Sequence, residues 1–376
     1  MKSSKAKKVM QKMLEHSDVA INGSRPWDIQ VRNPDFYERV LSGGSLSLGE
    51  SYMDGWWDCE ALDQFFERIL EDRLDKKVRI NFLLLLYIML KAKLINAQRR
   101  SRSYVIGRRH YDIGNNLFSI MLDKGLNYSC GYWEKAKDLD SAQEAKLDLV
   151  CRKLRLKPGM KVLDIGCGWG GFAKYSATEY GASVHGITVS KEQVKFANEF
   201  CQGLDVKVEL KDYRELKEEY DRIVSIGMFE HVGRSNCRTF MKVVHRCLKA
   251  YGLFLLHTIG GNTSVNSTDP WISKYIFPNS MLPSAKQITS AAQGLFVLED
   301  WHSFGQYYDI TLMAWHDNFA KNWNKLKDTY NERFYRMWTY YLLSCAGSFR
   351  SRRNQLWQIV FSKTGIKGGY QYCPMR

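Results

Sequence analysis

A glycine-rich segment, VLDIGCGWGG at Val162–Gly171, holds the residue types best suited to binding a ligand through the backbone. A short apolar run, interrupted only by Asp164, precedes glycines at Gly166, Gly168 and Gly170. Glycine permits positive φ and lets the chain approach a ligand closely. A dinucleotide fingerprint reads G-x-G-x-x-G, whereas this segment reads D-x-G-x-G-x-G. It therefore predicts a strand, a turn and a helix around another nucleotide-type cofactor; the alternative is a glycine-rich loop without a ligand.

This spacing resembles the first motif of S-adenosylmethionine-dependent methyltransferases, and polar residues follow the next two expected strands. Such enzymes usually present an acid to the ribose after the second strand, but this sequence has Thr188 there and Gln193 one turn into the next helix. We expect both to contact the ribose; the alternative for Gln193 is a surface position. Asp212, Tyr213 and Arg214 follow the third strand, where an adenine would be held.

Residues that could take part in catalysis lie at or just after the carboxyl ends of the fourth and fifth expected strands. Glu230 and His231 lie in GMFEHVG, and His257 lies in LLHTIG. Ligands of open α/β sheets bind beyond the carboxyl ends of the strands, so these side chains should face one crevice. A structural role is the alternative for His257. Upstream, Cys130 in YSCGYW, taken alone, indicates a buried core cysteine.

These residues need a sheet to position them, and strands alternate with helices from Lys161 onward. The pattern predicts an α/β fold, a Rossmann-like methyltransferase sheet with helices on both faces. Residues 1–80 form a small N-terminal α+β domain, 81–109 a basic linker and 110–376 the catalytic domain. Strands are expected at 161–165, 183–188, 206–210, 221–226, 253–258, 296–301 and 356–361, and long helices at 308–322 and 331–348.

The charge distribution favours a polyanionic partner. Net charge is +15, and residues 91–109 and 346–376 carry 13 of the excess charges. Such segments attract nucleic acid or an anionic membrane leaflet; a solvated basic face is the alternative. The nine apolar residues Phe82–Leu90 are too few to span a bilayer, so they indicate either a buried helix or a segment at the membrane surface.

Cysteine usage and the N-terminus point to the cytoplasm. The nine cysteines are scattered and contain no C-x-x-C pair, which indicates free thiols in a reducing compartment, with no disulfide framework and no metal site. The N-terminal segment is basic but lacks the continuous apolar core of a signal peptide.

Seven motifs in order resemble bacterial cyclopropane-fatty-acyl-phospholipid synthases, over nearly the whole chain. They are HYDIGNNLF, YSCGYW, VLDIGCGWGG, GMFEHVG, LLHTIG, DPWISKYIFPN and FGQYYDITLMAW. The related mycolic acid cyclopropane synthases are similar only over the catalytic part. The roughly 100 residues before His110 therefore favour the phospholipid-acting branch.

The resemblance implies methyl transfer from S-adenosyl-L-methionine to the cis double bond of an unsaturated phospholipid acyl chain, then proton loss from that methyl and ring closure. It also implies that the base is a bicarbonate ion, held by residues matching Cys130, Glu230, His257, Tyr308 and the backbone at Ile259. The cofactor contacts carried over are Tyr128, Ser129, Asp164, Gly166, Cys167, Gly168, Gly170, Thr188, Gln193, Tyr213 and Arg214.

On this interpretation the protein is peripheral to the inner leaflet of the bacterial cytoplasmic membrane, docked on anionic lipid by its N-terminal domain and basic segments. The family implies a homodimer. No nucleic-acid partner is expected, since an N-P-P-Y-type motif is absent.

One alternative function is that of a same-fold methyltransferase that gives a methyl-branched acyl product. Another is a basic binding module with a degenerate cofactor loop, against which the intact Gly166, Glu230 and His257 argue.

Overall fold

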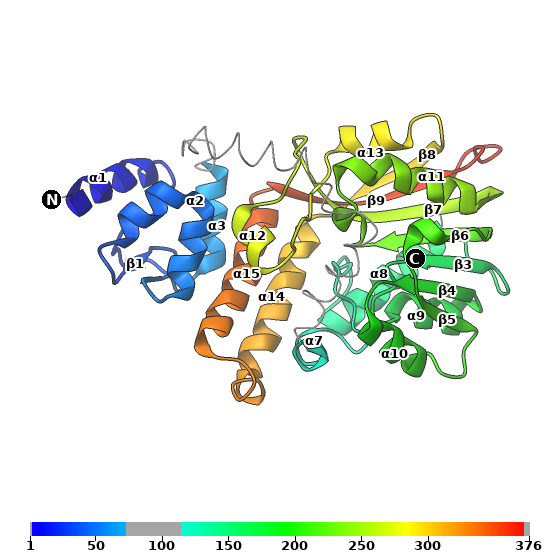
Figure 1. Ribbon diagram of the computed structural model, residues 1–376, viewed down its shortest axis with the longest axis horizontal. Helices are drawn as coiled ribbons and strands as arrows, with labels where there is room; N and C mark the ends of the chain where they lie inside the picture. The colour runs from blue at the N-terminus through cyan, green and yellow to red at the C-terminus, as the bar shows by residue number, and fades with distance from the viewer. Residues whose placement is uncertain (1, 73–113, 372–376) are drawn as a thin grey trace. The chain divides into compact units, whose positions relative to one another are not determined.

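The computed structural model describes residues 2–72 and 114–371 and contains two compact units (Figure 1). Of these residues, the first unit holds 2–72, 268–278 and 308–354, and the second holds 114–267, 279–307 and 355–371. The apolar run Phe82–Leu90 and the basic stretch Lys91–Arg109 lie outside the described residues. Within the described ranges, no helix is both long enough and apolar enough to cross a bilayer.

A seven-stranded sheet in the order β5-β4-β3-β6-β7-β9-β8 forms the second unit (Figure 1). Strands from β5 to β7 pair in parallel, and β8 pairs antiparallel with β9. This mostly parallel sheet confirms the predicted α/β fold class. The strands are β3 (Lys161–Ile165), β4 (Ser183–Thr188), β5 (Val206–Leu210), β6 (Tyr220–Ile226), β7 (Leu248–Gly261), β8 (Val297–Ser303) and β9 (Asn354–Ser362).

Side chains of the central strands alternate between two apolar cores, one on each face of the sheet. On β3, Val162 belongs to one core and Leu163 to the other, and on β7 Leu253 and Phe254 divide in the same way. Strands buried on both faces read as near-continuous apolar runs, which made them visible in the sequence. Helices α8 (Leu139–Lys153) and α9 (Gly171–Tyr180) complete one core, and α11 (Cys237–Cys247) and α13 (Ala285–Ala292) complete the other.

The order of the strands reverses at β3, because β4 lies on one side of it and β6 on the other. Register places Asp164 of β3 beside Gly186 of β4 and Val224 of β6, and Ile226 of β6 beside His257 of β7. The carboxyl ends of these four strands therefore meet at one edge of the sheet. Open α/β sheets bind their ligands at this edge, beside such a switch point.

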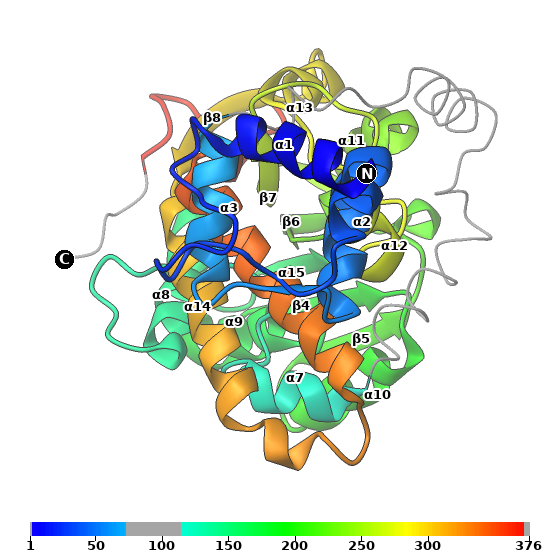
Figure 2. The same ribbon diagram turned by 90° about the vertical axis from the view of Figure 1, so that its left-hand side faces the viewer.

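Aromatic packing organises the helices of the first unit, whose ribbons are drawn in Figure 2. The ring centroid of Tyr340 lies 5.6 Å from that of Tyr52, 5.2 Å from that of Phe66 and 4.5 Å from that of Trp271. These four rings come from four different helices. The elements of the unit are α1 (Lys2–Leu14), α2 (Phe36–Met53), α3 (Leu62–Glu71), α12 (Pro270–Tyr275), α14 (Gln306–Lys321), η4 (Trp323–Lys325), α15 (Glu332–Arg350) and the short antiparallel pair β1 (Gln30–Val31) and β2 (Trp57–Asp58).

Helix α15 packs closely on α3. A Cβ on Gly347 would lie 2.5 Å from the carbonyl oxygen of Asp63, so the approach requires glycine. Arg350 donates from Nη1 to Asp63 at 2.6 Å and from Nη2 to Asp309 at 2.8 Å. Arg350 belongs to the basic stretch 346–376, but these ion pairs offset its charge inside the unit.

The two units differ from the predicted division, in which 110–376 form one domain. Residues 268–278 and 308–354 pack with the N-terminal helices instead. The physical reason is that α2 and α3 carry apolar faces, which α12 and α15 cover with aromatic side chains. This packing joins segments that are distant in the chain, so hydrophobic periodicity along the sequence does not reveal it.

Candidate active site

The glycine-rich loop between β3 and α9 adopts left-handed backbone at alternating positions. The φ angle is 86° at Gly166, 56° at Gly168 and 89° at Gly170, which explains the spacing of the glycines. A Cβ on Gly166 would lie 2.7 Å from the Met228 side chain, whereas one on Gly168 would meet nothing within 4 Å. The backbone at Gly168 therefore borders open space that a ligand can enter.

Asp164 and Cys167, two predicted cofactor residues, are buried beside this loop. Burial raises the pKa of Asp164 to about 7, and the charge of Lys146 partly offsets this effect. Burial also raises the pKa of the Cys167 thiol well above its usual value, and this side chain packs with Ala197 and Val208. A contact between Cys167 and a ligand would therefore come from its backbone.

Lys146, absent from the sequence-based predictions, holds the segment that contains Ser129. Lys146 is 1% exposed, and its Nζ donates to Ser129 Oγ at 3.0 Å and to Asn127 Oδ1 at 3.4 Å. Gln143, one turn earlier on α8, donates to the Ser129 carbonyl oxygen at 2.7 Å. Burial lowers the pKa of Lys146 to about 8. A signal existed in the sequence, because Gln143 and Lys146 fall on the buried face of their helix.

Aromatic contacts bring Tyr128 beside the glycine-rich loop. Its ring centroid lies 5.2 Å from that of Phe118 in α7 (Asn115–Met121), and Phe118 lies 4.8 Å from Trp169 in the loop. The predicted cofactor residues Tyr128 and Ser129 are thus anchored on two sides, by rings and by Lys146.

Thr188 and Gln193 meet at the carboxyl end of β4. Thr188 Oγ1 donates to Gln193 Oε1 at 2.7 Å, and the residues are 7% and 3% exposed. Burial excludes the surface alternative for Gln193. Ser190 caps α10 (Lys191–Phe200) by accepting the Gln193 N–H, which fixes the backbone here. Since Thr188 uses the amide oxygen, the amide hydrogens of Gln193 are the group that a ribose hydroxyl could meet.

Arg214 forms a bidentate ion pair with Asp212. Its Nε and Nη2 donate to the two carboxylate oxygens at 2.8 Å and 2.6 Å. The pair orders η1 (Tyr213–Glu215), whose Tyr213 ring packs edge-on against Phe240 at 5.3 Å. Arg214 therefore shapes the loop that presents Tyr213, and its own contact with a cofactor stays a prediction.

Glu230 is buried just beyond β6, in η2 (Phe229–His231). Its Oε1 accepts the Ile259 N–H at 2.7 Å, and its carbonyl oxygen accepts the Met281 N–H at 2.9 Å. The other carboxyl oxygen, Oε2, is buried and has no hydrogen-bond partner among the described residues. Burial raises the pKa of Glu230 to about 7. A carboxyl with one oxygen fixed and one unpaired is suited to accept a hydrogen bond from a ligand.

His257 lies opposite Ile226 in the register of β6 and β7 and is 1% exposed. Gln358 Nε2 lies 3.3 Å from His257 Nδ1, and with this amide orientation Nδ1 accepts and the ring hydrogen resides on Nε2. This Nε2 is also buried, and no group in the described part of the chain bonds to it. Burial lowers the pKa of His257 well below its usual value, and the charges of Lys146 and Lys153 add to the effect. His257 is therefore a neutral hydrogen-bond donor.

Cys130 and Ile259 lie in the same unit as Glu230 and His257. Cys130 is fully buried, and its Sγ donates to the carbonyl oxygen of Gly131 at 3.2 Å. The backbone at Ile259 is expected to help hold an anion, and its N–H donates to Glu230 in this structure. That bond fixes the carboxyl orientation, and the role of Ile259 toward an anion stays a prediction.

Tyr308 is the predicted catalytic residue that belongs to the first unit. It is 8% exposed, and its ring centroid lies 4.5 Å from that of Phe349 in α15. The other predicted site residues all belong to the second unit. The second unit therefore contains the predicted cofactor residues and four of the five predicted catalytic positions, and the part played by Tyr308 stays a prediction.

Comparisons with known proteins identify the family. The family model for mycolic acid cyclopropane synthetase matches residues 98–359. The "Cyclopropane-fatty-acyl-phospholipid synthase" of Escherichia coli (strain K12) is 54% identical over 362 residues, which cover 96% of this chain and 94% of that protein. The "Probable fatty acid methyltransferase" of Pseudomonas putida is 38% identical over 273 residues, 69% of each protein.

A solved structure shares the fold. Mycolic acid cyclopropane synthase CmaA1, complexed with SAH and CTAB, superposes with a TM-score of 0.65 at 32% identity. The match covers 69% of this chain and 98% of that chain. The similarity to the E. coli protein thus extends over more of the chain than the similarity to this mycolic acid enzyme, as expected from the motifs.

Proposed function

The chain belongs to the mycolic acid cyclopropane synthetase family and is an S-adenosylmethionine-dependent methyltransferase, and we propose that it converts the cis double bonds of unsaturated phospholipid acyl chains into cyclopropane rings. S-adenosyl-L-methionine would supply the methylene and leave as S-adenosylhomocysteine. The observation that carries the proposal is the 54% sequence identity with the E. coli cyclopropane-fatty-acyl-phospholipid synthase over 96% of this chain.

The chemistry explains why the site must be dry. An alkene is a weak nucleophile, and its attack on the sulfonium methyl leaves a carbocation that water would capture. Glu230, His257 and Cys130 are each at most 5% exposed, so protein atoms replace water around them. Their hydrogen bonds and charges act more strongly in such a low-dielectric environment than in water.

We also propose that a bicarbonate ion binds here, and two unpaired polar atoms support this. Glu230 Oε2 can accept a hydrogen bond from a hydroxyl, and His257 Nε2 can donate one to an oxygen. Cys130, Tyr308 and the backbone at Ile259 complete the set that the family resemblance names. When bound, the ion supplies a base small enough to reach the transferred methyl.

For the methyl donor, we propose that Gln193 and Thr188 meet the ribose and that Tyr213 borders the adenine. The open space at Gly168 supports close approach of the cofactor to the backbone. The remaining contacts named by the resemblance, Tyr128 and Ser129, are held beside the loop by the rings and by Lys146.

We propose that the protein works at the anionic inner leaflet of the cytoplasmic membrane, and helix α1 supports a basic docking face. Met10 and Leu14, one turn apart, are buried, whereas Lys5, Lys8 and Lys12 are exposed on the same helix. This arrangement presents a lysine stripe outward, which anionic lipid attracts.

Unsaturated phospholipid vesicles incubated with labelled S-adenosylmethionine test the proposal. We expect each converted double bond to gain the mass of one methylene, and saturated vesicles to gain none. Fragmentation of the product separates a cyclopropane from the methyl-branched alternative. The absence of label and mass gain would contradict the proposed function. Sedimentation of the purified protein tests the proposed homodimer separately.

A further inference from the structure

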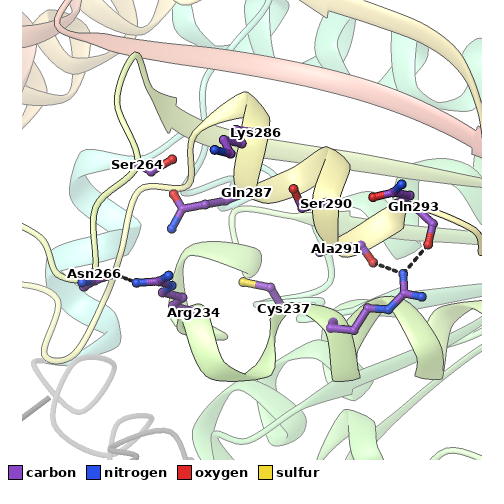
Figure 3. Close-up of a pocket in the computed structure, with 10 residues that line it drawn as sticks. Arg234, Cys237, Ser264, Asn266, Lys286, Gln287, Ser290, Ala291 and Gln293 are labelled. Atoms are coloured by element: carbon purple, nitrogen blue, oxygen red, sulfur yellow. Dashed lines mark hydrogen bonds between the residues drawn. The ribbon is translucent and has the colours of Figure 1, made fainter. Parts of the chain in front are cut away.

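A pocket of about 790 Å³ lies in the second unit, between α11 and α13 (Figure 3). Three of its ten lining residues are cationic and none is acidic. Most of the others carry hydroxyl or amide groups, which together with the cations can bind an anion. The residues that the argument uses are Arg234, Arg238, Ser264, Asn266, Lys286 and Gln287.

Hydrogen bonds fix the walls of this pocket. Ser264 Oγ lies 2.7 Å from Ser284 Oγ, and Gln287 Nε2 donates to the Val265 carbonyl oxygen at 2.8 Å. Arg238 Nη1 donates to the carbonyl oxygens of Ala291 and Gln293, at 2.7 Å and 2.6 Å, at the end of α13. The pocket is therefore built before a ligand arrives, a condition that reduces the entropy lost on binding.

The positive charges of the pocket have no carboxylate partner within the described ranges. Arg234 Nη1 donates to the neutral amide oxygen of Asn266 at 2.5 Å, and Arg238 donates to carbonyl oxygens. Lys249, an exposed cation elsewhere in the unit, pairs with Asp221 at 2.8 Å. Cations that share a pocket without an acid repel one another, and a bound anion relieves that repulsion.

The pocket is joined to the loop that carries Glu230. Arg234 follows Glu230 by four residues, in η3 (Arg234–Asn236). Met281 donates to the Glu230 carbonyl oxygen, and Ser284, three residues later, bonds to the pocket residue Ser264. One short segment thus contacts both the catalytic loop and the pocket wall.

We propose that this pocket binds the phosphodiester of the phospholipid substrate. This inference rests on the proposed function, because it is that function which makes a phospholipid the substrate. The volume exceeds what a small inorganic anion fills, and the arginines can donate paired hydrogen bonds to phosphate oxygens. The pocket thereby selects substrates that carry a phosphate over free fatty acyl chains.

The first arm of the test measures kinetics with vesicles of unsaturated phosphatidylglycerol. The double variant Arg234→Gln with Lys286→Gln should raise KM for lipid roughly tenfold and leave kcat and cofactor binding unchanged. Its control, Lys217→Gln with Lys242→Gln, removes the same charge from exposed positions outside the pocket lining. An equal rise in KM for both variants would overturn the proposal, because it would assign the effect to overall charge.

The second arm measures binding without turnover, by calorimetry with water-soluble short-chain phosphatidylglycerol and with inorganic phosphate. We expect the lipid to bind the wild-type protein at least tenfold more tightly than phosphate, and the pocket variant to lose this preference. Equal affinity for the two would overturn the assignment to a lipid headgroup. Pocket-dependent lipid binding without any cyclopropane product would support the pocket and contradict the proposed function.

Discussion

The two halves of the candidate site treat their buried polar atoms differently. In the half expected to bind the methyl donor, most polar side chains pair with one another, as in Thr188 with Gln193 and Lys146 with Ser129, although Gln143 Oε1 is buried without a partner among the described residues. In the other half, Glu230 Oε2 and His257 Nε2 are buried without a hydrogen-bond partner in the described part of the chain. A buried unpaired polar atom costs about 1 to 3 kcal/mol, so a ligand or water that bonds to these two atoms would stabilise the second half.

This difference suggests that one half of the site serves cofactor binding and the other half serves the chemical step. Paired side chains hold a rigid surface on which a cofactor can settle with little reorganisation. Unpaired atoms, by contrast, present a donor and an acceptor to whatever enters between them. Substitutions in the first half should therefore act on cofactor affinity, and substitutions in the second half should act on turnover.

The largest effect is expected from Glu230→Ala. The variant removes the acceptor that the unpaired oxygen provides, so turnover should fall by about a hundredfold to a thousandfold. Calorimetry should show S-adenosylmethionine affinity within about twofold of the wild type, since the donor half keeps its pairs. Glu230→Gln is the matched variant: it retains an oxygen for the Ile259 N–H but replaces the free acceptor, and it should lose turnover to a similar extent. A parallel loss of cofactor affinity would remove the distinction between the halves.

The next effect concerns Lys146→Met, which tests the paired half. Loss of the ammonium leaves Ser129 without its donor, so we expect S-adenosylmethionine to bind about tenfold more weakly, with kcat at saturation within a few-fold of wild type. Lys153→Met is the control, because Lys153 is equally buried on α8 but pairs with Asp300 at 3.0 Å. The control should lose stability in denaturant without losing cofactor affinity. A kcat defect in Lys146→Met at saturating cofactor would contradict the assignment.

A smaller effect is expected from Gly168→Ala. The added Cβ meets no protein atom, so the variant carries only the strain of a φ of 56°, about 1 kcal/mol, and obstructs whatever enters the open space. Cofactor affinity should fall several-fold by calorimetry. Gly159→Ala is matched, since Gly159 has a φ of 78° and equally open space but precedes β3. Equal losses of cofactor affinity in the two variants would mean that the loop at Gly168 is not a contact.

The same contrast explains what the sequence could predict. The strands β3, β4 and β5 match their predicted bounds, because buried parallel strands carry an apolar run that ends at a turn. The glycine-rich loop was equally predictable from the sequence, since each of its alternating glycines, Gly166, Gly168 and Gly170, has a positive φ angle.

Longer-range features left weaker signals, such as the polar Gln143 and Lys146 on the buried face of α8. The role of Lys146 depends on a partner seventeen residues away. The placement of α12 and α15 in the first unit depends on packing against helices from the distant N-terminal part of the chain. Whether Glu230 Oε2 and His257 Nε2 are paired is also invisible in a motif, because it depends on which neighbours the fold brings within hydrogen-bond distance. Local backbone requirements were predictable, and the satisfaction of buried polar atoms was not.

A pH dependence of stability reports the unpaired half directly. Burial raises the pKa of Glu230 from its usual 4.5 to about 7, so between these values the native protein holds a proton that the unfolded chain releases. The free energy of unfolding contributed by this group is therefore full below pH 4.5 and falls as pH rises toward 7, by at most about 1.4 kcal/mol for each pH unit. Denaturant unfolding of the wild type and of Glu230→Gln, compared from pH 5 to 8, isolates this term from the other titrating groups. The difference in stability should shift in favour of the variant as pH rises through that window. A difference that does not change with pH would mean that the carboxyl is already paired and ionised, and the contrast between the two halves would not hold.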